Sequence, residues 1–368
     1  MNQIIMEIPA RQSFSYSINV GFDLLSRPEE WLPRDSHTKR LVIITDDNVN
    51  KIYGEKLSHA LSRYEPLLLS FVPGEKSKNY QTKHLLEEQM IQHHCNRDTL
   101  ILALGGGVVG DLAGFIASTY MRGVPYIQIP TTLLAMVDSS VGGKTSINTH
   151  QGKNLIGAFW QPSCVVTDLN CLMTLSQEYL INGLVEAIKM FMTNDANHLN
   201  DLINNINNIL QKDISILKNI VEQAIKIKVD IVSQDEKESN QRMILNFGHT
   251  IGHALEKMTD YTMLHGYAVA LGILVESKIS QLSGFLSNEE FLIVQQLFSK
   301  LNISGSQLKN MNFDEIIQAT KADKKIKSGH VRYVLLKKLG QVCQENNTFA
   351  HPVSDEMVKN ALLDVSGG

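Results

Sequence analysis

The sequence has little of what marks disulfide-stabilised and thiolate-metal proteins. It contains four cysteines, and none of them forms a C-x-x-C pair. Disulfide frameworks and thiolate metal sites need cysteines paired at regular spacing. We therefore expect Cys95, Cys164, Cys171 and Cys343 to be small buried apolar residues.

Other absences exclude further classes of protein. The net charge is −4, so the chain lacks the basic excess that binds nucleic acids. No apolar run approaches the roughly 20 residues that cross a bilayer. The first residues lack the basic stretch and apolar stretch of a signal peptide. Hydrophobic residues make up 43% of the 368 residues, which suits two globular domains. We expect a cytoplasmic protein with neither a nucleic-acid nor a membrane partner.

Glycine, by contrast, is concentrated in one short stretch. Ten of the 24 glycines lie within residues 104–157, where they form three clusters. Glycine has no Cβ, so backbone N–H groups can close on a phosphate. The clusters, which we expect to be phosphate-binding loops, are residues 105–111, 141–145 and 152–154. The first follows an apolar run and precedes a helical pattern over 108–121, the context of a dinucleotide site. The other two carry lysine, which favours a nucleotide together with an anionic substrate.

The hydrophobic pattern changes near the middle of the chain. In the first half, β-rich runs alternate with helical stretches, which predicts a mostly parallel sheet with helices on its faces. The expected strands are 4–8 and 15–20, as a hairpin, and then 41–45, 67–71, 101–104, 126–129 and 165–167. Later the apolar spacing is helical over 180–194, 213–233, 246–258, 268–282 and 289–301, with one strand over 331–336. We predict a Rossmann-like α/β nucleotide-binding domain over residues 1–172 and a mainly α-helical domain over 173–368.

Several sequence blocks resemble the 3-dehydroquinate synthase family. They are GGGVVGDLAGF (105–115), RG (122–123), QIPTTLLA (128–135), VDSSVGGKT (137–145) and GKNLIG (152–157), and further motifs match to about residue 340. The resemblance implies a shikimate-pathway lyase that converts 3-deoxy-arabino-heptulosonate 7-phosphate to 3-dehydroquinate and phosphate. The steps would be oxidation by NAD, phosphate elimination, reduction and intramolecular aldol closure, so NAD would not be consumed. It also implies a zinc or cobalt ion and a homodimer.

The nucleotide site lacks a ribose-binding acid at the usual distance after the glycines. No carboxylate occurs between Asp111 and Asp138, whereas Asp46 ends the strand expected over 41–45. There its carboxylate can meet a ribose diol or cap the next helix, and the motif leaves both open. The resemblance implies cofactor contacts at Asp46, Asn48, Glu75, Lys78, Gly106, Gly107, Val108, Asp111, Thr131, Thr132, Lys153 and Thr174.

Three histidines, His249, His253 and His265, occur within 17 residues. The first two are four residues apart and share one helix face. A single histidine on such a helix is usually a core residue, but three together with a carboxylate suit zinc with an open coordination position. The resemblance implies that Glu186, His249 and His265 bind the metal. It leaves His253 as a hydrogen-bonding or acid–base group.

Cations gather in the motifs of a chain that is net acidic. Glu186 and Lys189 share a helix face, and their apolar surroundings favour a buried pair over a surface ion pair. The cations are Lys144, Lys153, Lys189, Lys228, Arg242 and Lys324, and together they imply a substrate with at least two anionic groups. In the family, lysines and Arg242 would anchor carboxylate and phosphate. The catalytic residues implied by the resemblance are Arg122, which would reach a second subunit, Asp138, Lys144, Asn154, Lys189, Lys228, Arg242, Asn246, His253 and Lys324.

Three other functions fit parts of this pattern. An iron-type alcohol or glycerol dehydrogenase shares the fold, but its iron-dependent members have histidine where this chain has Met190. A non-catalytic nucleotide-binding relative would not keep every matched catalytic position. The nearest alternative is a sugar 7-phosphate cyclase whose substrate lacks a carboxylate, and Arg242 with Lys324 favours a carboxylate substrate. The chain departs from the family pattern at residues 176–179 and at Tyr267, where we expect effects on local packing rather than on activity.

Overall fold

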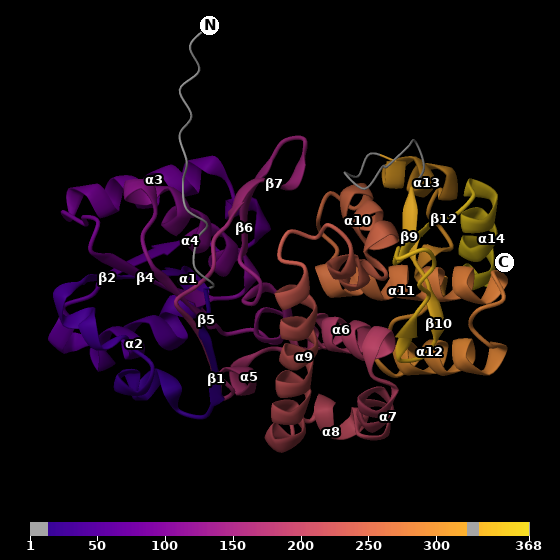
Figure 1. Cartoon of the computed structure of the whole chain (residues 1–368), viewed down its shortest axis with the longest axis horizontal. Helices are drawn as coiled ribbons and strands as arrows, with labels where there is room; N and C mark the ends of the chain where they lie inside the picture. Colours follow the sequence, from indigo (N-terminus) through magenta and orange to yellow (C-terminus); the bar gives the residue numbers. More distant parts are fainter. Residues whose placement is uncertain (1–13, 322–330, 368) are drawn as a thin grey trace, which may run out of the picture.

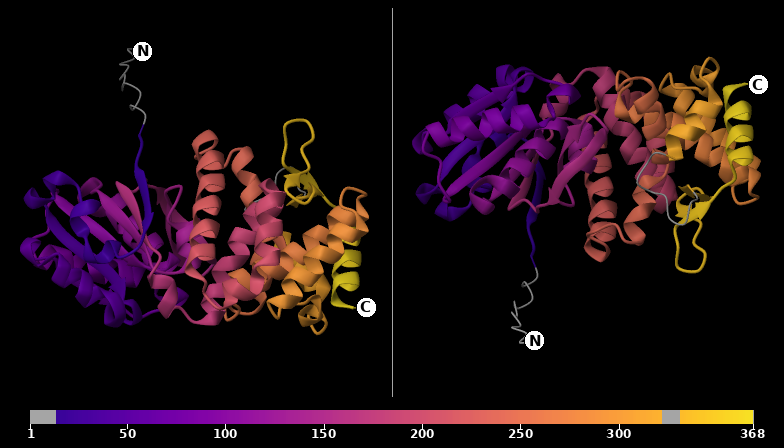
Figure 2. Two further views of the ribbon diagram at one scale, coloured as in Figure 1. Left: turned by 90° about the horizontal axis from the view of Figure 1, so that it is seen from below. Right: turned by 90° about the horizontal axis from the view of Figure 1, so that it is seen from above.

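The computed structural model describes residues 14–321 and 331–367. Its N-terminal part (residues 14–172) is a sheet covered by helices, and its C-terminal part (173–321 and 331–367) is mainly helical (Figure 1). Two further views show the parts side by side, with the C-terminal helix α14 (Asp355–Ser366) at the end remote from the sheet (Figure 2). No helix in the described ranges is long and apolar enough to cross a membrane.

The N-terminal part is built on a six-stranded sheet, and every pairing within it is parallel. The strands in spatial order are β1 (Ser17–Gly21), β8 (Cys164–Asp168), β5 (Tyr126–Pro130), β4 (Thr99–Gly105), β2 (Arg40–Asp46) and β3 (Leu67–Phe71). The predicted α/β fold is therefore confirmed. The strand expected over 15–20 is β1, which pairs with β8 at the sheet edge; its expected hairpin partner, 4–8, lies outside the described residues.

Side chains along the central strands alternate between two apolar cores. Val42 and Ile44 of β2 pack beneath α3 (Tyr80–Gln92) and α4 (Gly107–Thr119), because successive strand residues point to opposite faces. The other face carries a second core, which continues without interruption into the helices of the C-terminal part. The boundary between residues 172 and 173 stays a prediction. All four cysteines are free and buried, as expected.

The C-terminal part contains the predicted helices with some shifted boundaries. Its helices include α6 (Gln177–Asn194), α7 (Ala196–Asn204), α8 (Ile206–Leu210), α9 (Ile214–Gln234), α10 (His249–Met258), α11 (His265–Leu282), α12 (Asn288–Lys300) and α13 (Phe313–Lys321). The helix expected from 246 begins only at His249, because Gly248 has a left-handed φ of 78°. The helix expected from 268 begins earlier, at His265. The late strand divides into β9 (Arg332–Val334) and β10 (Leu336–Lys338).

The expectation of a loop was wrong for the third glycine cluster, residues 152–154, which begin a strand, whereas Gly142 and Gly143 of the second cluster lie in a loop with φ values of 102° and 66°. Residues 144 onward form an antiparallel hairpin of β6 (Lys144–Thr149) and β7 (Gly152–Phe159), which projects toward the C-terminal part (Figure 1). A Cβ at Gly157 would lie 2.0 Å from the Thr145 carbonyl oxygen, so this glycine allows the two strands to come together. The glycine content therefore reflects close strand packing as well as access for a ligand.

Candidate active site

A cleft of 1460 Å³ is lined by residues of both parts of the chain. Every residue that the sequence predicts to contact the cofactor lines it. At one end Asp46 accepts hydrogen bonds from the backbone N–H groups of Asn48 (2.9 Å) and Val49 (3.0 Å). Asp46 thus caps the short helix α1 (Asp47–Val49) and also faces the cleft, so the two interpretations left open by the motif are compatible.

The turn from β4 to α4 forms the floor of this end of the cleft. Gly106 is the residue before α4, and a Cβ there would lie 3.2 Å from Cγ2 of Thr132. The Thr131 N–H donates to the Gly105 carbonyl at 2.9 Å, which holds the two segments together. The N-terminus of α4 therefore opens on the cleft, where helix N–H groups bind phosphate.

A buried polar network joins the predicted cofactor residues to Asn154. Lys78 pairs with the Asp111 carboxylate and donates to Oδ1 of Asn154 at 2.6 Å. Burial would lower the pKa of Lys78, but the charges of Asp111 and Glu75 outweigh it and raise the pKa. Ser146 Oγ donates to the same Asn154 oxygen at 2.9 Å. The network thus links residues predicted for cofactor and for substrate.

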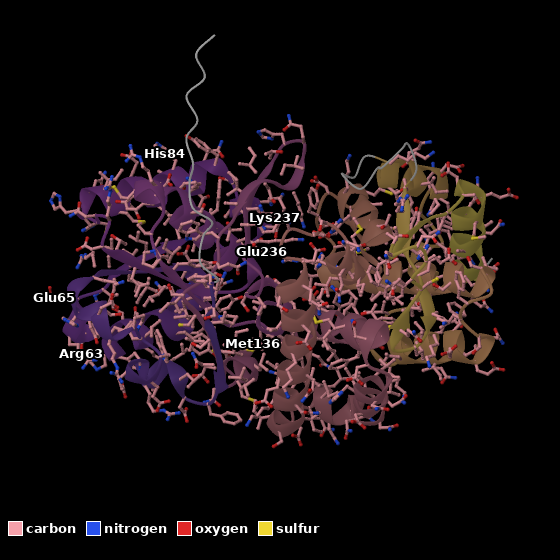
Figure 3. The ribbon with its side chains drawn as sticks, in the orientation of Figure 1. Arg63, Glu65, His84, Met136, Glu236 and Lys237 are labelled. Atoms are coloured by element: carbon pink, nitrogen blue, oxygen red, sulfur yellow. The ribbon has the colours of Figure 1, made fainter. Side chains whose placement is uncertain are left out.

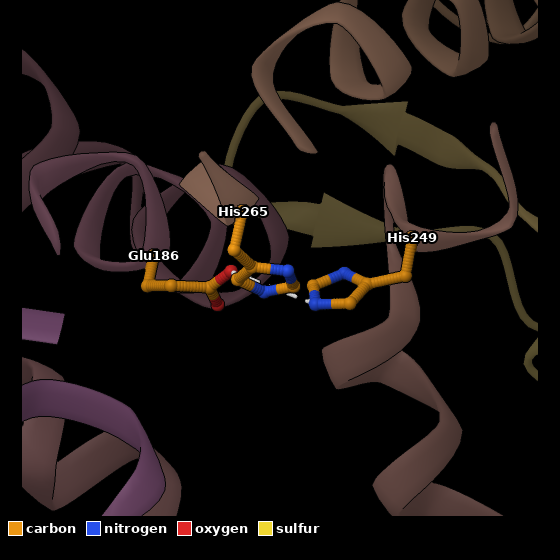
Figure 4. A group of neighbouring side chains, drawn as sticks. All are labelled: Glu186, His249 and His265. Carbon is orange, nitrogen blue, oxygen red and sulfur yellow. Dashed lines mark ion pairs between the residues drawn. The ribbon is translucent and has the colours of Figure 1, made fainter. Parts of the chain in front are cut away.

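The three predicted ligands converge beside the cleft, which His265 lines (Figure 4). Nε2 of His265 lies 3.3 Å and Nε2 of His249 lies 3.5 Å from Oε1 of Glu186. Nδ1 of His249 lies 3.1 Å from the Phe247 carbonyl oxygen. A carbonyl only accepts, so Nδ1 carries a proton, and Nε2 is the ring nitrogen that faces Glu186.

This group has the properties of a metal site. The Glu186 side chain is fully buried, and within the described residues neither of its oxygens accepts a well-aligned hydrogen bond, although Nζ of Lys189 lies 2.5 Å from Oε2. Burial would raise the pKa of Glu186, but Lys189 and His265 lower it to about 2. Burial would lower the pKa of His265, but Glu256 and Glu186 raise it to about 10. The site therefore favours positive charge, and two imidazoles with one carboxylate suit zinc or cobalt.

Close helix packing brings these ligands together. Gly266 follows His265, and a Cβ on it would lie 2.1 Å from the Asn182 carbonyl oxygen of α6. The Gly266 N–H donates to Oδ1 of Asn182 at 2.7 Å. Likewise, a Cβ at Gly272 would lie 1.9 Å from the Gly248 carbonyl oxygen at the start of α10. The glycines let α11 approach both α6 and α10, which carry Glu186 and His249.

A second acidic residue, Glu256, meets the same histidine from the opposite side. Its Oε2 lies 3.3 Å from Nδ1 of His265, and its Oε1 accepts from Nζ of Lys153 at 2.8 Å. His253, Glu256 and His265 form a second group that could hold a metal. The sequence interpretation missed Glu256. Its spacing of seven residues from His249 and three from His253, which places all three on one face of α10, could have identified it.

Buried cations lie beside the metal group. Nζ of Lys228 donates to Oδ1 of Asp138 at 2.6 Å, yet burial lowers the pKa of Lys228 to about 8. Asp138 opposes that shift, and Arg242 and Lys189 add to it. Nη2 of Arg242 donates to the Gly142 carbonyl at 3.2 Å, and Nη1 donates to the Glu236 carbonyl. These cations are buried and repel one another, so an anion bound between them would be stabilised.

The loop between α9 and the 3₁₀ turn Gln241–Asn246 contributes one residue, Glu238, to the lining of the cleft. Glu236 and Lys237 lie at the junction of the two parts (Figure 3). In this loop Glu238, which the sequence interpretation also missed, pairs with Lys144 and accepts from Nδ2 of Asn246. Asp235 fixes the loop by accepting from several of its backbone N–H groups. Lys144 and Asn246, both predicted to be catalytic, are therefore joined through one carboxylate.

Not every predicted residue lines this cleft: among the described residues, those outside its lining include Glu186, Lys189 and His249. Arg122 is exposed at the end of the 3₁₀ turn Tyr120–Arg122 and does not line the cleft of its own chain. Lys324 lies outside the described residues. The departures from the family pattern have structural roles: Ser176 caps α6, and Tyr267 packs, partly buried, against the larger core.

Solved structures with this architecture include two sugar phosphate cyclases. One is 2-epi-5-epi-valiolone synthase from Streptomyces hygroscopicus with NAD⁺ and Zn²⁺ bound, which is 26% identical with a TM-score of 0.88 and covers 98% of this chain and 99% of its own. The other is 2-deoxy-scyllo-inosose synthase complexed with carbaglucose-6-phosphate, NAD⁺ and Co²⁺, at 26% identity, a TM-score of 0.87 and coverage of 95% and 97%. Glycerol dehydrogenase from Schizosaccharomyces pombe, at 17% identity and a TM-score of 0.66, covers 98% and 92% and shares the fold alone.

Sequence comparison gives a closer relationship. Residues 68–182 match the 3-dehydroquinate synthase N-terminal model, and residues 183–326 match the 3-dehydroquinate synthase C-terminal model. The 3-dehydroquinate synthase of Nitrosomonas europaea is 42% identical over 95% of this chain and 95% of its own length. That of Buchnera aphidicola is 41% identical over 89% and 93%. The chain therefore belongs to the 3-dehydroquinate synthase family.

Proposed function

We propose that this chain is a cytoplasmic 3-dehydroquinate synthase that uses NAD and a divalent metal. It converts 3-deoxy-arabino-heptulosonate 7-phosphate to 3-dehydroquinate and phosphate. One observation carries the proposal: a single cleft is lined by a helix N-terminus suited to a nucleotide phosphate, by His265 of the histidine–carboxylate group and by several cations. A dehydrogenase acting on a neutral alcohol has no need of those cations.

The two cofactors would bind in this cleft and at the metal group beside it. Gly106, Gly107 and the N-terminus of α4 would hold the NAD pyrophosphate, and Glu186, His249 and His265 would hold the metal. When bound, NAD takes up and returns a hydride at one substrate carbon, and the metal polarises the oxygen on that carbon.

The chain's own residues would position the substrate and move its protons. Lys228 and Arg242 lie deep in the cleft and would hold the carboxylate, while Lys144 at its mouth would hold the phosphate. Asp138 keeps the Lys228 ammonium in place. His253 lines the cleft one helical turn after His249 and would donate or accept a proton on a substrate oxygen. Such fixed positioning can supply much of the rate acceleration.

Phosphate release with purified enzyme tests this proposal. We expect release from 3-deoxy-arabino-heptulosonate 7-phosphate to require NAD and a divalent metal, while absorbance at the nicotinamide band stays flat because oxidation and reduction cancel. Sedoheptulose 7-phosphate, which has no carboxylate, serves as the comparison substrate. Stoichiometric NADH accumulation would support the dehydrogenase alternative, and preference for the comparison substrate would support a carboxylate-free cyclase.

We propose that Arg122 acts in the site of a second subunit in a homodimer. Its exposure, outside the cleft of its own chain, supports this role. Arg122→Ala and Lys228→Ala are each expected to be nearly inactive. Mixed and reassembled, they should recover up to about a quarter of wild-type activity, because one of the two sites in a mixed dimer is intact. Recovery of no activity, although mixed dimers form, would place Arg122 in its own subunit's site.

A further inference from the structure

We propose that Glu256 is a positioning residue for the metal site. It holds the His265 ring with Nε2 toward Glu186, and through Lys153 it ties this orientation to the β6–β7 hairpin. This inference rests on the proposed function in one respect, the assignment of Glu186, His249 and His265 as metal ligands.

The geometry of His265 supports this role. Its ring lies between two carboxylates, with Nε2 3.3 Å from Glu186 Oε1 and Nδ1 3.3 Å from Glu256 Oε2. The Glu256 side chain is only 2% exposed, so its carboxylate is largely shielded from solvent. A ring nitrogen that donates to a carboxylate fixes the tautomer and makes the opposite nitrogen a better metal ligand. The arrangement thus leaves Nε2 directed at the candidate metal position.

The same contacts argue against Glu256 as a metal ligand. Its Oε1 accepts from Lys153 at 2.8 Å and its Oε2 lies 3.3 Å from Nδ1 of His265, so both oxygens already have partners, whereas neither oxygen of Glu186 accepts a well-aligned hydrogen bond within the described residues. If His253, Glu256 and His265 held the metal, the fully buried Glu186 carboxylate would not bind it. Glu256 is therefore better placed to orient His265 than to coordinate the ion.

Lys153 extends the link to the N-terminal part of the chain. It lies on β7, and besides the Glu256 pair its ammonium group lies 4.5 Å from the centre of the Tyr261 ring. Residues 153 and 256 are 103 positions apart, so the pair joins the hairpin to α10. Orientation of His265 consequently depends on how the hairpin packs against the helical part.

Cobalt binding to metal-free protein tests the proposal without measuring activity. Loss of a carboxylate that supports a metal-bound histidine weakens metal binding about 10–100-fold. We expect cobalt affinity to fall about 10-fold in Glu256→Gln, which keeps an acceptor for Nδ1, and about 100-fold in Glu256→Leu. Lys153→Met should weaken binding by a smaller factor. The cobalt absorption bands should keep the wild-type positions in Glu256→Gln, because the ligand set is unchanged.

Glu290→Gln is the matched control, because both oxygens of Glu290 also have partners, here the backbone N–H groups of Ser287 and Leu339, but Glu290 caps a different helix, α12. Its cobalt affinity should equal that of the wild type. Unchanged affinity in Glu256→Gln would overturn the positioning role. Complete loss of cobalt, as in His265→Ala, would also overturn it and make Glu256 a ligand. If Glu256→Leu does not fold, Glu256→Gln alone decides. Failure of the wild type itself to bind cobalt would instead count against the proposed function.

Discussion

Two histidines four residues apart have different surroundings in the folded chain. Nε2 of His249 faces the buried Glu186 carboxylate, whereas the His253 ring lies edge-on to that of His249, with ring centres 5.4 Å apart, and lines the cleft. The same residue type on the same helix face is thus directed at a metal position in one case and at substrate space in the other.

Alanine substitution should separate these two roles. His249→Ala removes a ligand, so we expect a loss of metal affinity larger than the roughly 10–100-fold cost of losing an outer-shell partner. His253→Ala should retain metal but turn over about 10²–10⁴-fold more slowly, the usual contribution of a general acid or base. Metal content and turnover, measured on both variants, check this. Equal metal loss would mean that both histidines bind the ion.

Arg242 combines a structural and a recognition role. Its guanidinium donates to the carbonyl oxygens of Gly142 and Glu236, and each Nη carries a second N–H that can serve a ligand. Arg242→Lys keeps the charge but loses the planar fork. We expect it to lose about 1.5–3 kcal/mol of transition-state binding, roughly tenfold to a hundredfold in kcat/KM.

A substrate analogue separates the recognition role from loosening of the loop. The analogue carries a hydroxymethyl group in place of the carboxylate. The wild type should discriminate strongly between substrate and analogue, and Arg242→Ala should discriminate weakly. If both enzymes showed the same ratio of kcat/KM values, Arg242 would not bind the carboxylate.

At the scale of elements, the site depends on how closely three helices approach. α6 carries Glu186, α10 begins at His249 and α11 begins at His265. Two of the ligands therefore sit at helix starts, where a small shift of the helix axis moves the imidazole directly.

Gly266→Ala should therefore damage the metal site through packing. The added Cβ would lie 2.1 Å from the Asn182 carbonyl oxygen, so α11 must move away from α6. We expect a loss of about 1–3 kcal/mol in the free energy of unfolding, together with weaker metal binding. Denaturant unfolding and metal titration measure the two effects.

Gly284→Ala is the control near the other end of α11. A Cβ there has open space, but the φ of 77° strains alanine. It should cost stability and leave metal affinity unchanged. Wild-type metal affinity in Gly266→Ala would show that the ligands tolerate the shift.

At the scale of the whole molecule, one apolar core runs from the sheet face opposite α3 and α4 into the C-terminal helices. Polar links also cross between the parts, among them Lys153 with Glu256 and Gln161 with Glu236. The cleft and the candidate metal group beside it therefore belong to one packed structure.

We predict that the chain unfolds in a single cooperative transition. NAD at 100 times its dissociation constant should stabilise the whole protein by about 2.7 kcal/mol, although its predicted contacts lie mostly in the N-terminal part. Calorimetry with and without NAD checks this. Two resolved transitions, with only one shifted by NAD, would mean that residues 1–172 unfold independently.

The sequence alone determined the elements whose residues interact locally. Strands such as β4 and helices such as α6 and α9 follow from apolar spacing, because that spacing sets which face can be buried. Every residue that the motif resemblance implied for cofactor contact lines the cleft.

Only the tertiary structure decided the contacts between distant segments. The Glu256–Lys153 link joins residues 103 positions apart, and the bridge from Glu238 to Lys144 joins residues 94 positions apart, so no local period relates them. Whether a carboxylate becomes a ligand, a support for a ligand or a partner of a lysine depends on what docks against it. Periodicity along one chain specifies which face is buried, but not which neighbour buries it, because that is set by helices and strands packing in three dimensions.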